Sequence, residues 1–239
     1  MLAFPVAMAV VLVVLTVALG RAYARRRGPH QAAWTVALAV GAVGTLAYIG
    51  CVLAGGDPAL FKVYYVAGAL LTAPLLGLGS MYLLPRVRWA RVYLGVTVVG
   101  GALGTVGIVG QPLDRAALQA LDFGPGAGLV HAPLALVPLV VLNTLGTVAV
   151  AGVGVWSLVG ALRRQRPWPF VAGNALIVVA TLLIAAAGSM ARLDHGRGFW
   201  AGMTVGWAVL YVGVLVMGAY HPSAVRGRAS EAPSAPRPA

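Results

Sequence analysis

Charged side chains are scarce in this chain, and acidic ones are the scarcest. Only 9% of its 239 residues are charged, and 5 of those are Asp or Glu, whereas roughly a quarter of an ordinary soluble domain is charged. At the same time 60% of the residues are hydrophobic. A soluble fold of this size could not keep so much apolar surface out of water. The composition therefore excludes a soluble globular domain and predicts that the bilayer surrounds most of the chain.

Several cofactor and coupling chemistries are excluded by residues that are missing from the apolar runs. No Asp or Glu lies within any run, which argues against a proton relay or a cation-coupled pump. The four histidines all lie near the ends of runs, so no pair can hold a haem at mid-membrane. The last run has no lysine for a retinal Schiff base, and the single Cys51 cannot form an internal disulfide. We therefore expect no cofactor.

Seven long apolar runs are what the sequence does contain. Each is long enough to cross a hydrocarbon core of ~30 Å, which takes about 20 helical residues. The runs are 2–20, 32–54, 59–83, 89–110, 133–160, 168–190 and 198–220. Arginines follow the first run and none precedes it, which indicates a retained anchor and not a cleaved signal. The prediction is an all-α bundle of seven transmembrane helices over residues 1–220, with a disordered tail at 221–239.

Basic residues are distributed unequally between the two sides of this predicted bundle. One side holds the loops after the first, third and fifth runs and the tail, with Arg21, Arg25, Arg26, Arg27, Arg86, Arg88, Arg91, Arg163, Arg164, Arg166, Arg226, Arg228 and Arg237. The other side holds Lys62, Arg115, Arg192 and Arg197. The positive-inside rule then predicts an N-terminus outside and a C-terminus in the cytoplasm. Insertion alone accounts for the high net charge, so no nucleic-acid partner is expected.

The composition also suggests where the protein resides and what it touches. Arginine greatly outnumbers lysine, and Ala, Val, Leu and Gly dominate, which we interpret as a bacterial protein of the plasma membrane. The arginine loops leave a further option open. Besides setting the topology, they could attract anionic lipid headgroups, at ~1 kcal/mol per basic residue near the surface.

Two segments of the sequence resemble each other. Arg25-Arg26-Arg27-Gly28-Pro29 precedes a Trp-bearing run, and Arg163-Arg164-Gln165-Arg166-Pro167-Trp168 does the same. With the fourth run as a connector, this gives a 3+1+3 plan of parallel repeats. Its architecture resembles that of the small sugar exporters known as SWEETs, although their proline-glutamine loop motif is absent here. The alternative is that the predicted topology alone places arginines after the first and fifth runs.

Glycine and proline predict how the helices pack. Gly101, Gly104, Gly107 and Gly110 recur every three residues in the fourth run, so this helix should contact its neighbours closely, as a central connector would. Pro74 and Pro138 remove backbone hydrogen bonds within their runs and should bend them. These bends are either ordinary membrane-helix geometry or the walls of a cavity in the outer half.

Candidate ligand-binding residues lie in a polar layer near mid-membrane. The layer holds Thr45, Thr72, Asn143, Thr144, Thr181, Trp207 and Tyr211. Such groups commonly tie helices together, at ~0.6 kcal/mol per hydrogen bond. If they form a site, Asn143 supplies the amide and Trp207 the apolar wall, with Tyr211 and Thr72 beside them. Lys62 lies near the outer interface, where it either extends to the surface or binds an anionic group.

A metal site is the weakest of the candidate sites. His131, Asp194 and His195, with Asp114 and Asp122, are predicted to lie outside the membrane and are suitable ligands or acid–base groups. Their spacing matches no metal-binding signature of the H-E-x-x-H kind.

Three functions follow in order of preference. The first is passage or binding of a small neutral or apolar molecule within the bundle. The second is a non-catalytic sensor or accessory subunit, which docks a membrane partner or a second copy through the arginine loops. The third is a metal-dependent enzyme of the outer face. A pocket at the depth of Asn143 would favour the first, and a packed interior the second.

Overall fold

Seven helices long and apolar enough to cross a membrane make up the computed structural model, which describes residues 2–120, 124–191 and 196–218. The predicted all-α bundle of seven spans is therefore confirmed, and the predicted tail lies outside the described residues. The spans are α1 (Ala3–Arg26), α2 (Pro29–Leu53), the third span Pro58–Met81, α5 (Val87–Gly110), α7 (Pro133–Arg163), α8 (Trp168–Met190) and α9 (Gly196–Gly218). The third span consists of α3 (Pro58–Val63), the π-helix η1 (Tyr64–Leu71) and α4 (Thr72–Met81).

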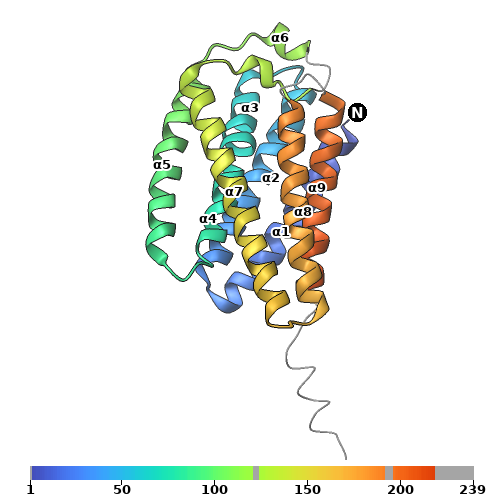
Figure 1. Ribbon diagram of the computed structural model, residues 1–239. Coiled ribbons are helices and arrows are strands. Elements are labelled where there is room, and N and C mark those ends of the chain that lie inside the picture. Colours follow the sequence, from blue (N-terminus) through green and yellow to red (C-terminus); the bar gives the residue numbers. More distant parts are fainter. Residues whose placement is uncertain (1, 121–123, 192–195, 219–239) are drawn as a thin grey trace, which may run out of the picture.

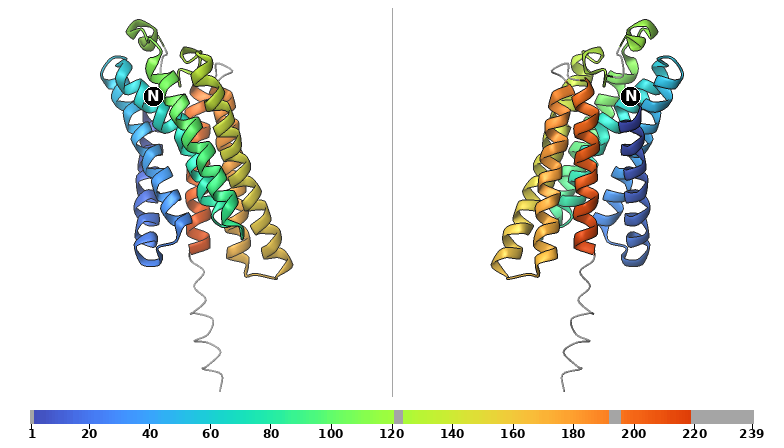
Figure 2. Two further views of the ribbon diagram at one scale, coloured as in Figure 1. Left: turned by 90° about the vertical axis from the view of Figure 1, so that its left-hand side faces the viewer. Right: turned by 90° about the vertical axis from the view of Figure 1, so that its right-hand side faces the viewer.

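Six spans form a ring, and α5 lies outside it. In chain order α1, α2, the third span, α7, α8 and α9 pack each against the next, and α9 returns to α1 (Figures 1 and 2). α5 packs against α7 and the third span at the edge of the bundle (Figure 1). The expectation of a central connector is therefore wrong. The ring order suits a 3+1+3 repeat, but packing in chain order gives the same ring, so the repeat stays a prediction.

The two ends of the bundle differ in charge and cover. We call one the arginine end, where the loops after α1, α4 and α7 lie. The other is the α6 end, where the loop between α5 and α7 carries α6 (Arg115–Gln119) and the 3₁₀ turn η2 (Ala127–Leu129) (Figure 1). Asp57 and Asp114 accept hydrogen bonds from Leu60 N at 2.9 Å and Ala116 N at 3.2 Å, which caps α3 and α6. Which end faces the cytoplasm stays a prediction.

Glycine brings several helices into backbone contact. A Cβ on Gly44 of α2 would lie 2.4 Å from the backbone nitrogen of Gly68 in the third span. A Cβ on Gly146 of α7 would lie 2.5 Å from the carbonyl of Ala73, and one on Gly107 of α5 would lie 2.5 Å from Ala135 N. Lipid supplies no hydrophobic drive for helix association, so such close approach supplies the packing contacts.

The glycine stripe predicted for the fourth run is only partly buried. Gly101, Gly104 and Gly107 are buried against the third span and α7, whereas Gly110 is exposed. Because α5 has neighbours on one side only, the rest of its surface is free to face lipid. The stripe therefore marks a single packed face on a peripheral helix.

Candidate functional site

An aromatic cluster fills the ring at the α6 end. Its members are Tyr48 of α2, Phe61, Tyr64 and Tyr65 of the third span, and Phe199 and Trp200 of α9, all of them buried. The ring centroids of Tyr48 and Trp200 lie 4.3 Å apart, and those of Tyr48 and Tyr64 lie 5.1 Å apart. These distances are typical of packed aromatic pairs. The cluster thus joins α9 to α2 and the third span and occupies the ring interior at this end.

The α5–α7 loop covers the aromatic cluster. The Tyr48 hydroxyl donates to the carbonyl of Gly124 at 3.2 Å, and the Tyr64 hydroxyl donates to that of Pro125 at 3.4 Å. Buried tyrosine hydroxyls require such partners, and here the loop backbone supplies them. The sequence alone does not indicate this cluster, because its members belong to three separate spans that only the ring brings together.

Lys62 caps a neighbouring helix. Its ammonium group donates to the carbonyl of Val109 at 2.8 Å, in the last turn of α5. Carbonyls in a last helical turn lack backbone donors, and a positive charge there also offsets the helix dipole. Lys62 therefore fastens the third span to the end of α5, and its role in binding an anionic ligand stays a prediction.

Asn143 joins α7 to the third span. Its side-chain amide donates to the carbonyl of Ala69 at 2.7 Å and to that of Leu139 at 2.8 Å. Ala69 lies in η1, where the backbone changes from i→i+5 to i→i+4 hydrogen bonding, and Pro74 shortly beyond supplies no N–H. Where the hydrogen-bond pattern changes, a backbone carbonyl is left without a backbone donor. The side chain of Asn143 supplies a donor to one such carbonyl, that of Ala69. This contact explains why an amide stands at position 143.

Replacing Asn143 by leucine should destabilise the bundle, because the carbonyl of Ala69 loses its side-chain donor. We expect a loss of ~1 kcal/mol of unfolding free energy, since hydrogen bonds between membrane helices average ~0.6 kcal/mol and reach about 1.7. Unfolding in mixed micelles measures it. Thr144→Leu is the matched control, because Thr144 is exposed on the same helix. Equal stability of the two variants would contradict the proposed contact.

The other predicted ligand-binding residues do not join into one polar site. Thr72 is buried and donates to the carbonyl of Ala67 within its own span at 2.8 Å. Trp207 is only 2% exposed, and its indole N–H has no partner among the described residues. Tyr211 is half-buried against the core. No hydrogen bond links any two of Asn143, Thr72, Trp207 and Tyr211 in the described structure, so their role as a site stays a prediction.

The predicted metal site lies largely outside the described residues. Asp122, Asp194 and His195 are not described, and His131 is exposed at the α6 end. Asp114 caps α6. Within residues 2–120, 124–191 and 196–218, no three His, Cys, Asp or Glu side chains come close enough to hold a metal ion.

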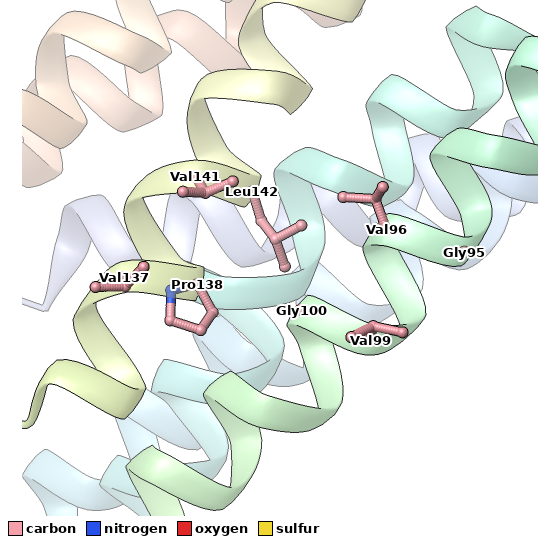
Figure 3. A pocket seen from close by; sticks show the side chains of 8 residues that line it. All are labelled: Gly95, Val96, Val99, Gly100, Val137, Pro138, Val141 and Leu142. Atoms are coloured by element: carbon pink, nitrogen blue, oxygen red, sulfur yellow. The ribbon is translucent and has the colours of Figure 1, made fainter.

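An apolar groove runs between α5 and α7 (Figure 3), and its lining on α7 ends at Leu142, next to Asn143 in the sequence. We call it the α5–α7 groove. Its volume is about 420 Å³, and its lining consists of Gly95, Val96, Val99, Gly100, Val137, Pro138, Val141 and Leu142. Val96, Val99, Val137 and Val141 are all exposed at the surface of the bundle. The groove therefore opens sideways, toward the lipid, and lies outside the ring.

Glycine and proline shape the α5–α7 groove. A Cβ on Gly95 would meet nothing within 4 Å, so this residue leaves open space at the groove. A Cβ on Gly100 would lie 3.2 Å from the side chain of Leu142. Pro138, for which a cavity wall was one of two alternatives, lines the α7 side (Figure 3). The sequence could indicate the α7 wall through Pro138, but not that α5 would face it.

The seven apolar helices of this fold indicate a multi-pass membrane protein. Searches against protein-family models, curated proteins and solved structures find no match for this chain.

Proposed function

We propose that this protein binds a small apolar molecule of the bilayer in the α5–α7 groove. The observation that carries the proposal is a shallow groove of about 420 Å³ whose lining residues are all apolar and which opens to the outer surface of the bundle. Ligand pockets commonly span about 300–1,000 Å³ and are mostly apolar. A molecule dissolved in the bilayer can enter from the side without crossing water. The proposal keeps the plasma-membrane location that the composition predicts.

Binding is favoured over passage because of the aromatic cluster. A molecule crossing through the ring would have to displace Tyr48, Tyr64 and Trp200, which pack together and lie beneath the α5–α7 loop. The α5–α7 groove needs no such opening. It also requires neither Asn143 nor Trp207, in contrast to the site expected inside the bundle.

Selectivity in the α5–α7 groove must come from shape. Lipid tails are as apolar as valine, so entering the groove gains no hydrophobic free energy over remaining in the bilayer. What remains is close contact, at ~0.1–0.2 kcal/mol for each pair of atoms at optimal separation. A molecule whose chain reaches the space beside Gly95 makes contacts that a chain of another shape does not.

A sensor or accessory subunit is the second candidate. It is favoured by the packed aromatic cluster and by three exposed tryptophans near the arginine end, Trp89, Trp156 and Trp168. Tryptophan is enriched both at membrane interfaces and at protein interfaces. In this alternative the arginine loops dock a membrane partner or a second copy of the chain. No described cluster of residues favours the outer-face enzyme.

Photolabelling of the full chain in nanodiscs tests the binding proposal. A neutral fatty alcohol carrying an alkyl diazirine should crosslink within residues 95–100 and 137–142. Gly95→Phe should reduce that labelling at least five-fold, because the phenyl group of the new side chain fills the open space beside α5. Gly152→Phe is the control, since Gly152 is exposed in α7, has nothing within 4 Å of its Cβ position and lies outside the groove. Labelling spread evenly over the lipid-facing surface would reject the proposal.

A further inference from the structure

We infer that the ligand of the α5–α7 groove is an anionic phospholipid, whose headgroup phosphate is bound by Arg91 and Arg88 at the start of α5. This inference rests on the proposed function: the apolar part that enters the groove is an acyl chain, and the inference adds the charged headgroup to which that chain is attached. One acyl chain occupies the groove, and the headgroup lies at the arginine end.

The helix geometry places Arg91 in line with the α5–α7 groove. Residues 91, 95 and 99 are spaced i, i+4 and i+8 on α5, so they share one face of the helix. Gly95 and Val99 of that face line the groove. At ~1.5 Å per residue, Arg91 lies about 6 Å from Gly95 and about 14 Å from Gly100 along the helix axis, on the side of the arginine end. The distance of about 14 Å is close to half the thickness of a ~30 Å hydrocarbon core. A lipid with its phosphate at Arg91 therefore extends its chain along the groove.

The two arginines are free to bind a phosphate. Arg88 and Arg91 are exposed, and among the described residues neither takes part in an ion pair or side-chain hydrogen bond. Arg115 at the other end differs, because its guanidinium donates to the carbonyls of Gly55 and Ala54. Guanidinium groups bind phosphate through paired N–H donors, which suits a lipid phosphodiester.

The surroundings of Arg88 and Arg91 favour a negative ligand. The guanidinium of Arg88 lies 5.4 Å from the ring centre of Trp89. Tryptophan is enriched at the interface between membrane and water, where a lipid headgroup lies. The described carboxylates are Asp57 and Asp114, and both cap helices at the α6 end. No described acidic side chain therefore neutralises the arginine end. A zwitterionic headgroup would leave this excess charge uncompensated.

Native mass spectrometry of the full chain with bound lipid tests the inference. The probes are phosphatidylglycerol and phosphatidylcholine with identical acyl chains, so that only the headgroup differs. The unaltered protein should retain phosphatidylglycerol preferentially. Arg91→Gln should lower that preference about five-fold, and the Arg88→Gln, Arg91→Gln double variant about 25-fold, since ~1 kcal/mol per arginine corresponds to a factor of about five. Gly95→Leu should lower retention of both lipids.

Two controls separate the inference from the proposed function. Arg164→Gln removes an exposed arginine at the same end that lies in the α7–α8 loop, and Gly152→Leu adds bulk outside the groove. Neither should alter lipid retention. If Gly95→Leu blocks both lipids while the double arginine variant keeps its headgroup preference, the inference is overturned and the proposed function stands. An equal effect of Arg164→Gln and Arg91→Gln also overturns it. If Gly95→Leu changes nothing, both fail.

Discussion

Gly44→Ala is expected to destabilise the bundle strongly, although alanine is the better helix former. The new Cβ would lie 2.4 Å from the backbone nitrogen and 2.6 Å from the Cα of Gly68. Backbone atoms cannot rotate away as a side chain can, so α2 and the third span must move apart. Overpacking of this kind typically costs about 1–3 kcal/mol, occasionally more. Helix propensity alone would instead favour alanine by about 1 kcal/mol.

The opposing signs of these two effects make the measurement decisive. Unfolding in mixed micelles should show a lower midpoint for Gly44→Ala. Gly152→Ala is the matched control, because it is also a glycine within a membrane helix but has nothing within 4 Å of its Cβ position. That variant should be unchanged or slightly more stable. If both substitutions stabilise the protein equally, α2 and the third span do not cross at Gly44 and Gly68.

Trp200→Ala should have the largest effect of any truncation in the aromatic cluster. Trp200 is 4% exposed and packs on Phe199, Tyr48 and Tyr64, at centroid distances of 4.8, 4.3 and 6.1 Å. Removing a buried tryptophan typically costs about 3–5 kcal/mol. The truncation would leave a cavity where the indole packs, and α9 would lose its aromatic contacts with α2 and the third span. The near-ultraviolet circular dichroism of the packed aromatic rings should weaken as well.

A tryptophan at the surface supplies the comparison for Trp200. Trp168 begins α8 at the arginine end and is 75% exposed. Trp168→Ala should therefore leave the unfolding midpoint nearly unchanged and affect only its interface contacts. If Trp168→Ala and Trp200→Ala destabilise the protein equally, the aromatic cluster does not hold the ring together and does not block passage through it.

The ring of six spans and the peripheral helix α5 differ in how they are packed. The ring is fastened by backbone contact at glycines and by the aromatic cluster, which favours a rigid scaffold. α5 stands outside the ring with one packed face and one lipid-facing surface. A site between a peripheral helix and a rigid ring can exchange its occupant with the bilayer while the ring stays closed. This arrangement is the one that the proposed binding of a bilayer molecule requires.

Three of the polar residues proposed as ligand-binding make architectural contacts in the structure. Asn143 satisfies a carbonyl beside η1, Thr72 bonds within its own span, and Lys62 caps α5. In a medium without water, polar side chains are needed first wherever the backbone is left unpaired. The sequence shows Pro74 but not the π-helix before it, so the unpaired carbonyl could not be foreseen. Only the local backbone register gives Asn143 its partner.

The sequence by itself determined the number and extent of the spans. A bilayer of fixed thickness demands about 20 apolar residues for each helix, and this length can be counted along the chain. Capping by Asp57 and Asp114 is likewise local, because a cap bonds to a backbone N–H two or three residues away.

The tertiary structure alone decided which helices are neighbours. An apolar side chain has a similar solvation free energy against lipid and against another helix. Hydropathy therefore cannot distinguish a helix face that packs on a neighbour from one that faces lipid. For this reason the glycine stripe of α5 indicated close packing but not a place at the edge of the bundle. The aromatic cluster and the α5–α7 groove join residues far apart in sequence, such as Tyr48 with Trp200 and Gly100 with Leu142. Their contacts depend on the shapes of the helix surfaces, which exist only once the helices have packed.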